Sequence, residues 1–160
     1  MKKFNEIFLD LDGVMFDFDG GVKRITGKFP HELDKREMWK RINSTRDFFF
    51  NLDLLPRAME MYRYIKTLEM THDVKTRILT GLPSMTGSAD QKRRAVAQYI
   101  DQDLEVIVLP SKNKVLHAKP NAILIDDREE MTSPWSRQGG FAILHRSVDE
   151  TIEILKATFP

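Results

Sequence analysis

The sequence predicts an α/β fold, a doubly wound (Rossmann-like) parallel sheet with a small helical cap inserted after the first strand. Two observations predict the sheet: short apolar runs rich in β-branched residues recur along the chain, and amphipathic helical patterns lie between them. A third observation predicts the cap, because the interval from residue 13 to about residue 74 contains no convincing strand. That interval is too long for a single crossover connection.

The expected strands are five short apolar runs. Each run is too short for a helix, and continuous apolar character is typical of strands that are covered on both faces. The five runs are residues 7–9, 77–79, 106–109, 123–125 and 141–144.

Helical patterns occupy the intervals between these runs. Pro56 suits a first helical turn, and apolar residues follow it at spacings of three. Apolar stripes also mark helices at residues 95–100 and 148–159, and Ser147 with Glu150 is typical of a capping box at the start of the last one. Strands that alternate with helices imply right-handed βαβ units.

The long interval after the first strand is the expected cap. We expect residues 1–15 and 72–160 to form the core domain and residues 16–71 to form the cap. The cap segment holds far more aromatic surface than a linker needs: Phe16, Phe18, Phe29, Trp39, Phe48, Phe49 and Phe50. Of the three consecutive phenylalanines at 48–50, we expect two to pack inside the cap.

The composition is that of a soluble globular protein, with 41% hydrophobic and 31% charged residues and a net charge of +1. This small charge argues against an extended nucleic acid as partner. The absence of cysteine excludes disulfides, thiol nucleophiles and thiolate metal sites, and it is compatible with a reducing compartment. No apolar run approaches the roughly 18 residues of a membrane span, and the N-terminal residues do not resemble a signal peptide. We therefore expect a cytoplasmic protein without membrane association.

Reactive side chains follow three of the expected strands. The first strand leads into Asp-Leu-Asp-Gly at residues 10–13, the second into Thr-Gly at residues 80–81, and the fourth into Asp-Asp at residues 126–127. Ligands of open parallel sheets bind beyond the carboxyl ends of the strands. We therefore expect these carboxylates and the threonine hydroxyl to share one crevice.

Carboxylates that crowd together repel one another, and a divalent cation removes this difficulty. Oxygen ligands of this kind suit Mg²⁺. A carboxylate can also attack phosphorus, so Asp10 can form an aspartyl-phosphate while Asp12 protonates the leaving group and later activates water. A lysine must balance the remaining charge, and the candidates are Lys92, Lys112 and Lys114.

These motifs resemble those of the haloacid dehalogenase-like superfamily. Residues 10–14, Asp-Leu-Asp-Gly-Val behind an apolar strand, look like its first motif. Thr80 looks like the second motif, a lysine in the segment 112–114 like the third, and residues 123–127 like the fourth. The resemblance covers nearly the whole chain and implies a phosphatase.

A closer resemblance is to the 5'(3')-deoxyribonucleotidases. It is carried by residues 12–14 and 17–18, Trp39, residues 48–52 and 55–56, and residues 124–128. Members of that family remove phosphate from deoxynucleoside monophosphates, and their small helical cap supplies aromatic residues around the base. The resemblance thus implies a nucleoside monophosphate as substrate.

The resemblance also implies a role for each motif residue. Asp10 is the implied nucleophile and Asp12 the acid/base. Asp10, the backbone carbonyl of Asp12 and Asp126 are implied to hold Mg²⁺, with Asp127 as a further ligand through water. The residues implied to contact the substrate are Thr80, Gly81 and Lys114 at the phosphate, with Lys112 as the reserve, and Phe18 and Trp39 at the base.

The sequence departs from the family pattern in a shorter cap, in a longer and more basic segment at residues 112–120, and at two single positions. The family has a serine after its motif-two threonine, whereas Gly81 stands here, so a contact to phosphate or sugar is lost or passes to a backbone amide. A second tryptophan expected before Phe48 is missing, and Asn43 falls near that place.

Other interpretations stay open. The same chemistry could serve another small phosphate ester or the 3' end of a polynucleotide. A non-enzymatic receiver-like module also uses an acidic cluster, a threonine and a lysine, but its phosphorylated aspartate ends the third strand, where Leu109-Pro110 stands here. We expect residues 92–94 to form a solvated helix face, and a homodimer is left open.

Overall fold

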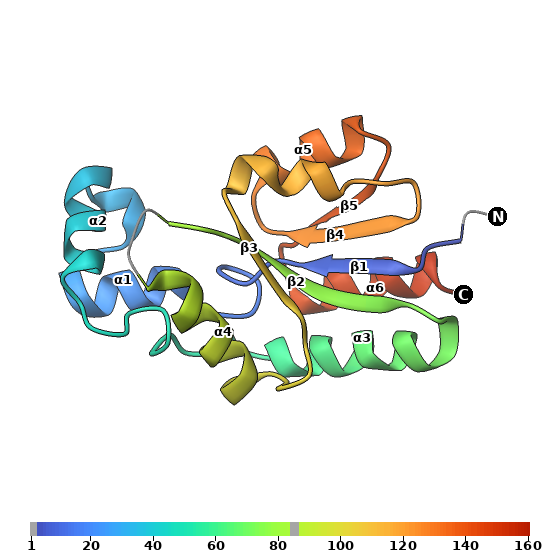
Figure 1. Cartoon of the computed structure of the whole chain (residues 1–160), viewed down its shortest axis with the longest axis horizontal. Coiled ribbons are helices and arrows are strands. Elements are labelled where there is room, and N and C mark those ends of the chain that lie inside the picture. The colour runs from blue at the N-terminus through green and yellow to red at the C-terminus, as the bar shows by residue number, and fades with distance from the viewer. Residues whose placement is uncertain (1–2, 84–86) are drawn as a thin grey trace.

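A five-stranded parallel sheet forms the centre of the computed structural model, which describes residues 3–83 and 87–160 (Figure 1). Within these residues the strands are β1 (Glu6–Leu9), β2 (Lys75–Gly81), β3 (Val106–Leu109), β4 (Ala122–Asp126) and β5 (Phe141–Leu144), in the spatial order β3-β2-β1-β4-β5. Each strand contains one of the apolar runs, and every pairing is parallel. The predicted fold class and all five predicted strands are confirmed.

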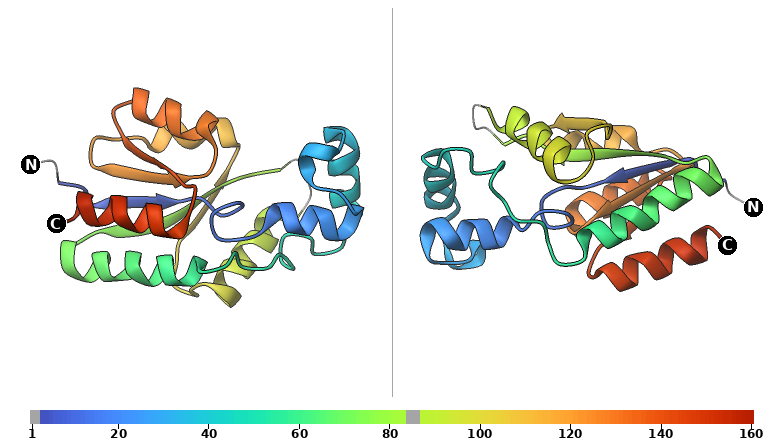
Figure 2. Two further views of the ribbon diagram at one scale, coloured as in Figure 1. Left: turned by 180° about the vertical axis from the view of Figure 1, so that it is seen from behind. Right: turned by 90° about the horizontal axis from the view of Figure 1, so that it is seen from below.

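Helices cover both faces of the sheet, as alternation along β1 requires. Ile7 and Leu9 pack into one apolar cluster together with α3 (Ala58–His72), α4 (Ser88–Tyr99) and α6 (Val148–Thr158). Phe8, which points the other way, packs against Trp135 of α5 (Glu129–Arg137). The 3-10 helix η2 (Ser111–His117) contacts α5 on that second face. Figure 2 shows α3 and α6 together on one side of the sheet. No helix of the described residues has the length and apolar character that crossing a membrane requires.

The helix predictions are confirmed in position for α4 and α6, and the Ser147 hydroxyl accepts the expected hydrogen bond from the Glu150 amide at 3.1 Å. Pro56 is not in the first turn of α3. That helix begins at Ala58 because Arg57 before it has a left-handed backbone with φ of 63°. Helix α5 was not predicted, since Pro134 lies inside it and its exposed side is polar.

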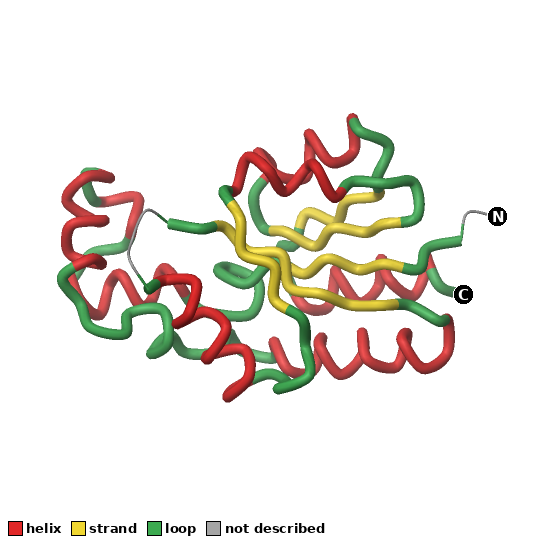
Figure 3. The backbone as a smooth tube through the Cα atoms, in the orientation of Figure 1, coloured by secondary structure: helices red, strands yellow, loops and turns green. Residues whose placement is uncertain are grey.

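The cap consists of α1 (Phe18–Thr26), the short helix η1 (Pro30–Glu32) and α2 (Lys35–Asn43), and it stands apart from the sheet (Figures 1 and 3). Its buried side chains include Val22, Met38, Ile42, Phe48 and Phe49, and they are continuous with the main apolar cluster of the sheet domain. As expected, two of the three consecutive phenylalanines are buried there, while Phe50 is only partly buried.

The two chain segments that join the cap to the core run side by side. Phe16 and Leu54 form an antiparallel bridge, and the Leu55 amide donates to the Met15 carbonyl at 2.8 Å. Helix α3 follows this crossing and contacts β2 and α6, so it lies in the helical layer on the sheet. We expected the cap to reach residue 71. We instead propose that it ends at this crossing, near residue 53, and that α3 belongs to the core.

Candidate active site

The acidic residues that end β1 and β4 meet at one edge of the sheet. Leu9 pairs with Ile125, and the Asp10 amide donates to the Ile125 carbonyl at 2.9 Å, so β1 and β4 end at the same level of the sheet. One carboxylate oxygen from each of Asp10, Asp126 and Asp127 lies within 4.8 Å of the others. The spatial order of strands reverses between β1 and β4, which is the place where open α/β sheets bind ligands.

Gly13 allows this close approach. Its φ is +83°, a left-handed conformation that suits glycine, and a Cβ at this position would collide with the Asp127 carboxylate. The loop after β1 can therefore fold back over the acidic cluster only with glycine here.

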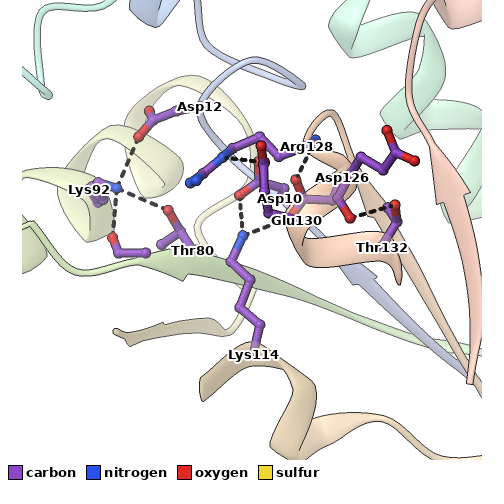
Figure 4. A network of polar contacts seen from close by, with 11 residues as sticks. Asp10, Asp12, Thr80, Lys92, Lys114, Asp126, Arg128, Glu130 and Thr132 are labelled. Carbon is purple, nitrogen blue, oxygen red and sulfur yellow. Dashed lines mark hydrogen bonds and ion pairs between the residues drawn. The ribbon is translucent and has the colours of Figure 1, made fainter. Parts of the chain in front are cut away.

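Lys114 lies in the middle of the cluster (Figure 4). Its Nζ donates to Asp10 Oδ1 at 2.7 Å and to Asp126 Oδ2 at 2.8 Å, and the residue is only 4% exposed. Burial disfavours the ammonium form, but the two carboxylates raise the pKa of Lys114 above its ordinary value. Lys112, the reserve candidate, is exposed. Of the two lysines, the structure brings Lys114 to the acids.

Burial and the crowding of carboxylates raise the pKa of Asp126 and of Asp127. Burial, followed by the charge of Asp10, raises the pKa of Asp126 to about 6. The same two causes, with Asp126 added, raise the pKa of Asp127 to about 7. The buried Oδ1 atom of Asp127 has no hydrogen-bond partner among the described residues. An oxygen-only set of ligands with an unsatisfied carboxylate fits a hard divalent cation such as Mg²⁺.

Lys92, one of the three lysine candidates, belongs to the site although we expected it on a solvated helix face. It is 2% exposed, so the prediction of a solvated helix face is wrong for this residue, although Arg93 and Arg94 are exposed. Its Nζ donates to Asp12 Oδ2 at 3.0 Å, to Thr80 Oγ1 at 3.0 Å and to the Gly81 carbonyl at 2.8 Å (Figure 4).

The burial of Lys92 follows from its place on α4. Ala95 and Val96 stand three and four residues later and are both fully buried, so all three side chains share the inward face of the helix. That spacing was present in the sequence, but the charges of two neighbouring arginines obscured it.

Asp12, in the loop after β1, and Thr80, in β2, both accept a hydrogen bond from Lys92 Nζ. Thr80, in β2, is 1% exposed, and Lys92 ties its hydroxyl to the Asp12 carboxylate. The second oxygen of Asp12, Oδ1, is buried without a hydrogen-bond partner among the described residues. The described residues therefore leave one acceptor of Asp12 unsatisfied beside the cavity that Asp12 lines.

A cavity of about 600 Å³ joins this edge of the sheet to the cap. On the core side its lining includes Asp10, Asp12, Thr80, Gly81, Lys92, Ser111, Lys114, Asp127 and Arg128, and on the cap side it includes Phe18, Asp19, Lys35, Met38 and Trp39. Asp126 lies beneath the surface of the cavity and is fully buried. The volume lies within the usual range of small-molecule sites.

Two aromatic rings line part of the cap side of the cavity. The Phe18 and Trp39 ring centroids are 6.1 Å apart, and both rings are partly buried. Behind Phe18, Phe49 stacks on it at 6.3 Å with an interplanar angle of 20°, and Phe48 meets it edge-on at 5.9 Å. The buried pair therefore supports Phe18 from behind, while Phe18 and Trp39 face the cavity.

Helix α4 also holds the cap. The side-chain carbonyl of Gln91 accepts a hydrogen bond from the Phe49 amide at 2.9 Å, and Lys92 Nζ lies 4.8 Å from the centroid of the Phe49 ring. Two consecutive residues of one helix therefore contact the cap loop and the acidic site.

Comparison with known proteins gives two curated relatives. The chain is 31% identical to the mitochondrial 5'(3')-deoxyribonucleotidases of Homo sapiens and of Mus musculus, over 79% of this chain in each case. It spans 63% of the human protein and 66% of the mouse protein, which is less than two thirds of either. No protein-family model matches the chain.

Solved structures share the fold at low sequence identity. A hydrolase from Streptococcus pneumoniae superposes with a TM-score of 0.59 at 12% identity, over 98% of this chain and 100% of that one. A HAD family hydrolase from Deinococcus radiodurans, with bound phosphate and sodium, has a TM-score of 0.58 at 13% identity, over 97% and 89%. A HAD family enzyme from Bacteroides thetaiotaomicron, in complex with magnesium and inorganic phosphate, has a TM-score of 0.51 at 11% identity, over 89% and 94%.

Proposed function

We propose that the chain is a member of the haloacid dehalogenase-like superfamily and a magnesium-dependent phosphatase of (deoxy)nucleoside monophosphates. Its sequence relation to the 5'(3')-deoxyribonucleotidases and the fold that it shares with HAD family hydrolases support this proposal. The observation that carries this proposal is the pairing of two charge networks at one cavity. Lys114 joins Asp10 to Asp126, and Lys92 joins Asp12 to Thr80.

Asp10 is the nucleophile in this proposal. One of its carboxylate oxygens forms a bond to phosphorus, and the bond from phosphorus to the nucleoside oxygen breaks. Lys114 orients the carboxylate through Oδ1 and offsets its charge. Asp10, Asp126 and the Asp12 carbonyl would hold Mg²⁺, with Asp127 reached through water. When bound, this ion supplies positive charge that shields the phosphate from the attacking carboxylate.

Asp12 acts as the acid and then as the base. It gives a proton to the departing nucleoside oxygen, and it later takes a proton from the water that attacks the aspartyl-phosphate. Lys92 and Thr80 lie beside it, where they would donate to the phosphate oxygens of a bound substrate. Lys92 therefore shares with Lys114 the role that we first gave to a single lysine.

The residues of the cap that line the cavity support the proposed substrate class. Phe18 and Trp39 line the same cavity as Asp10 and Asp12, and its volume of about 600 Å³ exceeds what inorganic phosphate alone would need. Flat apolar rings of this kind stack on bases of any sequence. This arrangement supports a nucleoside monophosphate over a small sugar phosphate.

A phosphate-release screen tests the proposal. The panel holds all ribo- and deoxyribonucleoside monophosphates as 5' and 3' esters, with sugar phosphates and 3'-phosphorylated oligonucleotides as the competing classes. We expect nucleoside monophosphates to be hydrolysed fastest, and only with Mg²⁺ present. Folded protein that releases phosphate from none of the nucleotides, or prefers a competing class, refutes the assignment.

A further inference from the structure

A residue larger than glycine does not fit at position 81 unless Ser111 moves, because Ser111 fills the adjacent space. A Cβ built on Gly81 would collide with the Ser111 hydroxyl oxygen and would lie 3.6 Å from the Ser111 Cβ. Gly81 does not have a positive φ, so its backbone does not require glycine. The hydroxyl of Ser111 therefore occupies the volume that a side chain after Thr80 would take.

The fold fixes Ser111 in this place. Gly81 pairs with Leu109 at the end of β2 and β3, and the Leu82 amide donates to the Leu109 carbonyl at 2.8 Å. After Pro110, Ser111 is the first residue of η2, the helix that also carries Lys114. Both residues line the cavity together with Asp10 and Thr80.

The Ser111 hydroxyl is available for a ligand. The residue is partly buried, and among residues 3–83 and 87–160 no protein group forms a hydrogen bond with this hydroxyl. Thr80, by contrast, already shares its oxygen with Lys92 at 3.0 Å. A neutral donor at the β3 side of the site can reach the anion without adding to the charge.

We propose that Ser111 is a substrate-binding residue whose hydroxyl donates a hydrogen bond to a phosphate oxygen from the position left open by Gly81. This inference rests on the proposed phosphatase function and deepens it. The phosphate is then contacted from α4 by Lys92, from β2 by Thr80, and from η2 by Ser111 and Lys114. The family pattern places a serine directly after its motif-two threonine, and here the hydroxyl comes instead from Ser111, in the connection between β3 and β4.

Two single variants remove this donor by different routes. Ser111→Ala deletes the hydroxyl, and Gly81→Ala pushes it aside without changing Ser111. We expect each to weaken the binding of inorganic phosphate in Mg²⁺ by about 10- to 100-fold, the range for a hydrogen bond to a charged group. The double variant should lose no more than either single variant, because both changes remove the same contact. Ser136→Ala, an exposed serine on α5, is the matched control and should bind like the wild type.

A rescue variant makes the test specific. Gly81→Ser combined with Ser111→Gly moves the hydroxyl to the strand within the same volume, and we expect it to recover phosphate affinity and kcat/KM to within a few-fold of the wild type. Tm measurements check that each variant is folded, and Ser111→Thr, which keeps the hydroxyl, replaces Ser111→Ala if that variant is unstable. It should retain affinity while Gly81→Ala loses it.

The outcomes separate the two proposals. If folded Ser111→Ala and Gly81→Ala bind phosphate as tightly as the wild type, or if the wild type binds no phosphate, the role of Ser111 is refuted. If they lose affinity while the wild type hydrolyses no nucleotide, Ser111 stands as a phosphate ligand and only the nucleotide assignment fails.

Discussion

Replacing Lys92 with methionine should separate catalysis from stability. The variant keeps most of the length of the side chain and removes the ammonium that contacts Asp12, Thr80 and the Gly81 carbonyl at 2.8–3.0 Å. A donor aimed at charge that develops in the transition state is worth about 10²- to 10³-fold in kcat. We therefore expect Lys92→Met to lower kcat by about that factor.

The expected loss of stability is much smaller. Lys92 is 2% exposed, so folding strips water from its charge, and removing the charge removes this cost. The three acceptors lose hydrogen bonds, which together would cost a few kcal/mol, but Asp12 retains access to water because its side chain is 24% exposed. The two effects oppose each other, and we expect a net change of about 1–2 kcal/mol or less in the free energy of unfolding.

Arg93→Met is the matched control, because Arg93 is the next cation on the same helix and is exposed. Initial rates on the best nucleotide of the screen give kcat and KM, and denaturant titration gives the free energy of unfolding. If Lys92→Met keeps kcat within about threefold, or if Arg93→Met loses as much, Lys92 has no part in the chemistry.

Three further predictions concern the acids and the cap. Asp10→Asn should abolish turnover without lowering Tm, and Asp12→Asn should slow turnover by about 10²- to 10⁴-fold. Rapid-quench assays should find no phosphoprotein in Asp10→Asn, and phosphoprotein detected in that variant would exclude Asp10 as the nucleophile. Because the pKa of Asp127 is raised to about 7, the native state binds this proton more tightly than the unfolded chain, so the contribution of the proton to stability is present at low pH and is lost as pH rises towards 7. In EDTA the Tm difference between the wild type and Asp127→Asn should therefore widen from pH 5 to pH 8, and it should shrink when Mg²⁺ is added. A Tm difference that does not depend on pH would contradict this. Phe18→Ala should raise KM by about 5- to 100-fold with little change in kcat, the range for loss of one stacked base, while Phe29→Ala, on an exposed part of the cap, serves as the control and should not.

The sheet and its acidic edge could be predicted from the sequence because local pattern and topology agree there. Runs of β-branched residues are strands in a parallel sheet, and parallel strands all end at one edge, so Asp10, Thr80 and Asp126 had to converge. No contact between these residues had to be known in advance.

The burial of Lys92 could not be predicted from the sequence, because it depends on which face of α4 packs against the sheet. Lys92 lies on the inward face of α4 among charged neighbours, and its three oxygen partners come from segments far away in the chain. The replacement of a side chain at Gly81 by Ser111 is likewise a fact of packing between two strand ends. Helix α5 escaped prediction for a local reason, because proline in its interior is a helix breaker in most sequences.

The adjacent contacts of Gln91 and Lys92 give α4 a second importance. Phe49 cannot move away from the sheet without breaking the bond from its amide to Gln91 or carrying the start of α4 with it. In the latter case Lys92 moves as well, and the ammonium leaves Asp12 and Thr80. The position of the cap and the charge network around Asp12 are therefore coupled through two neighbouring residues of one helix.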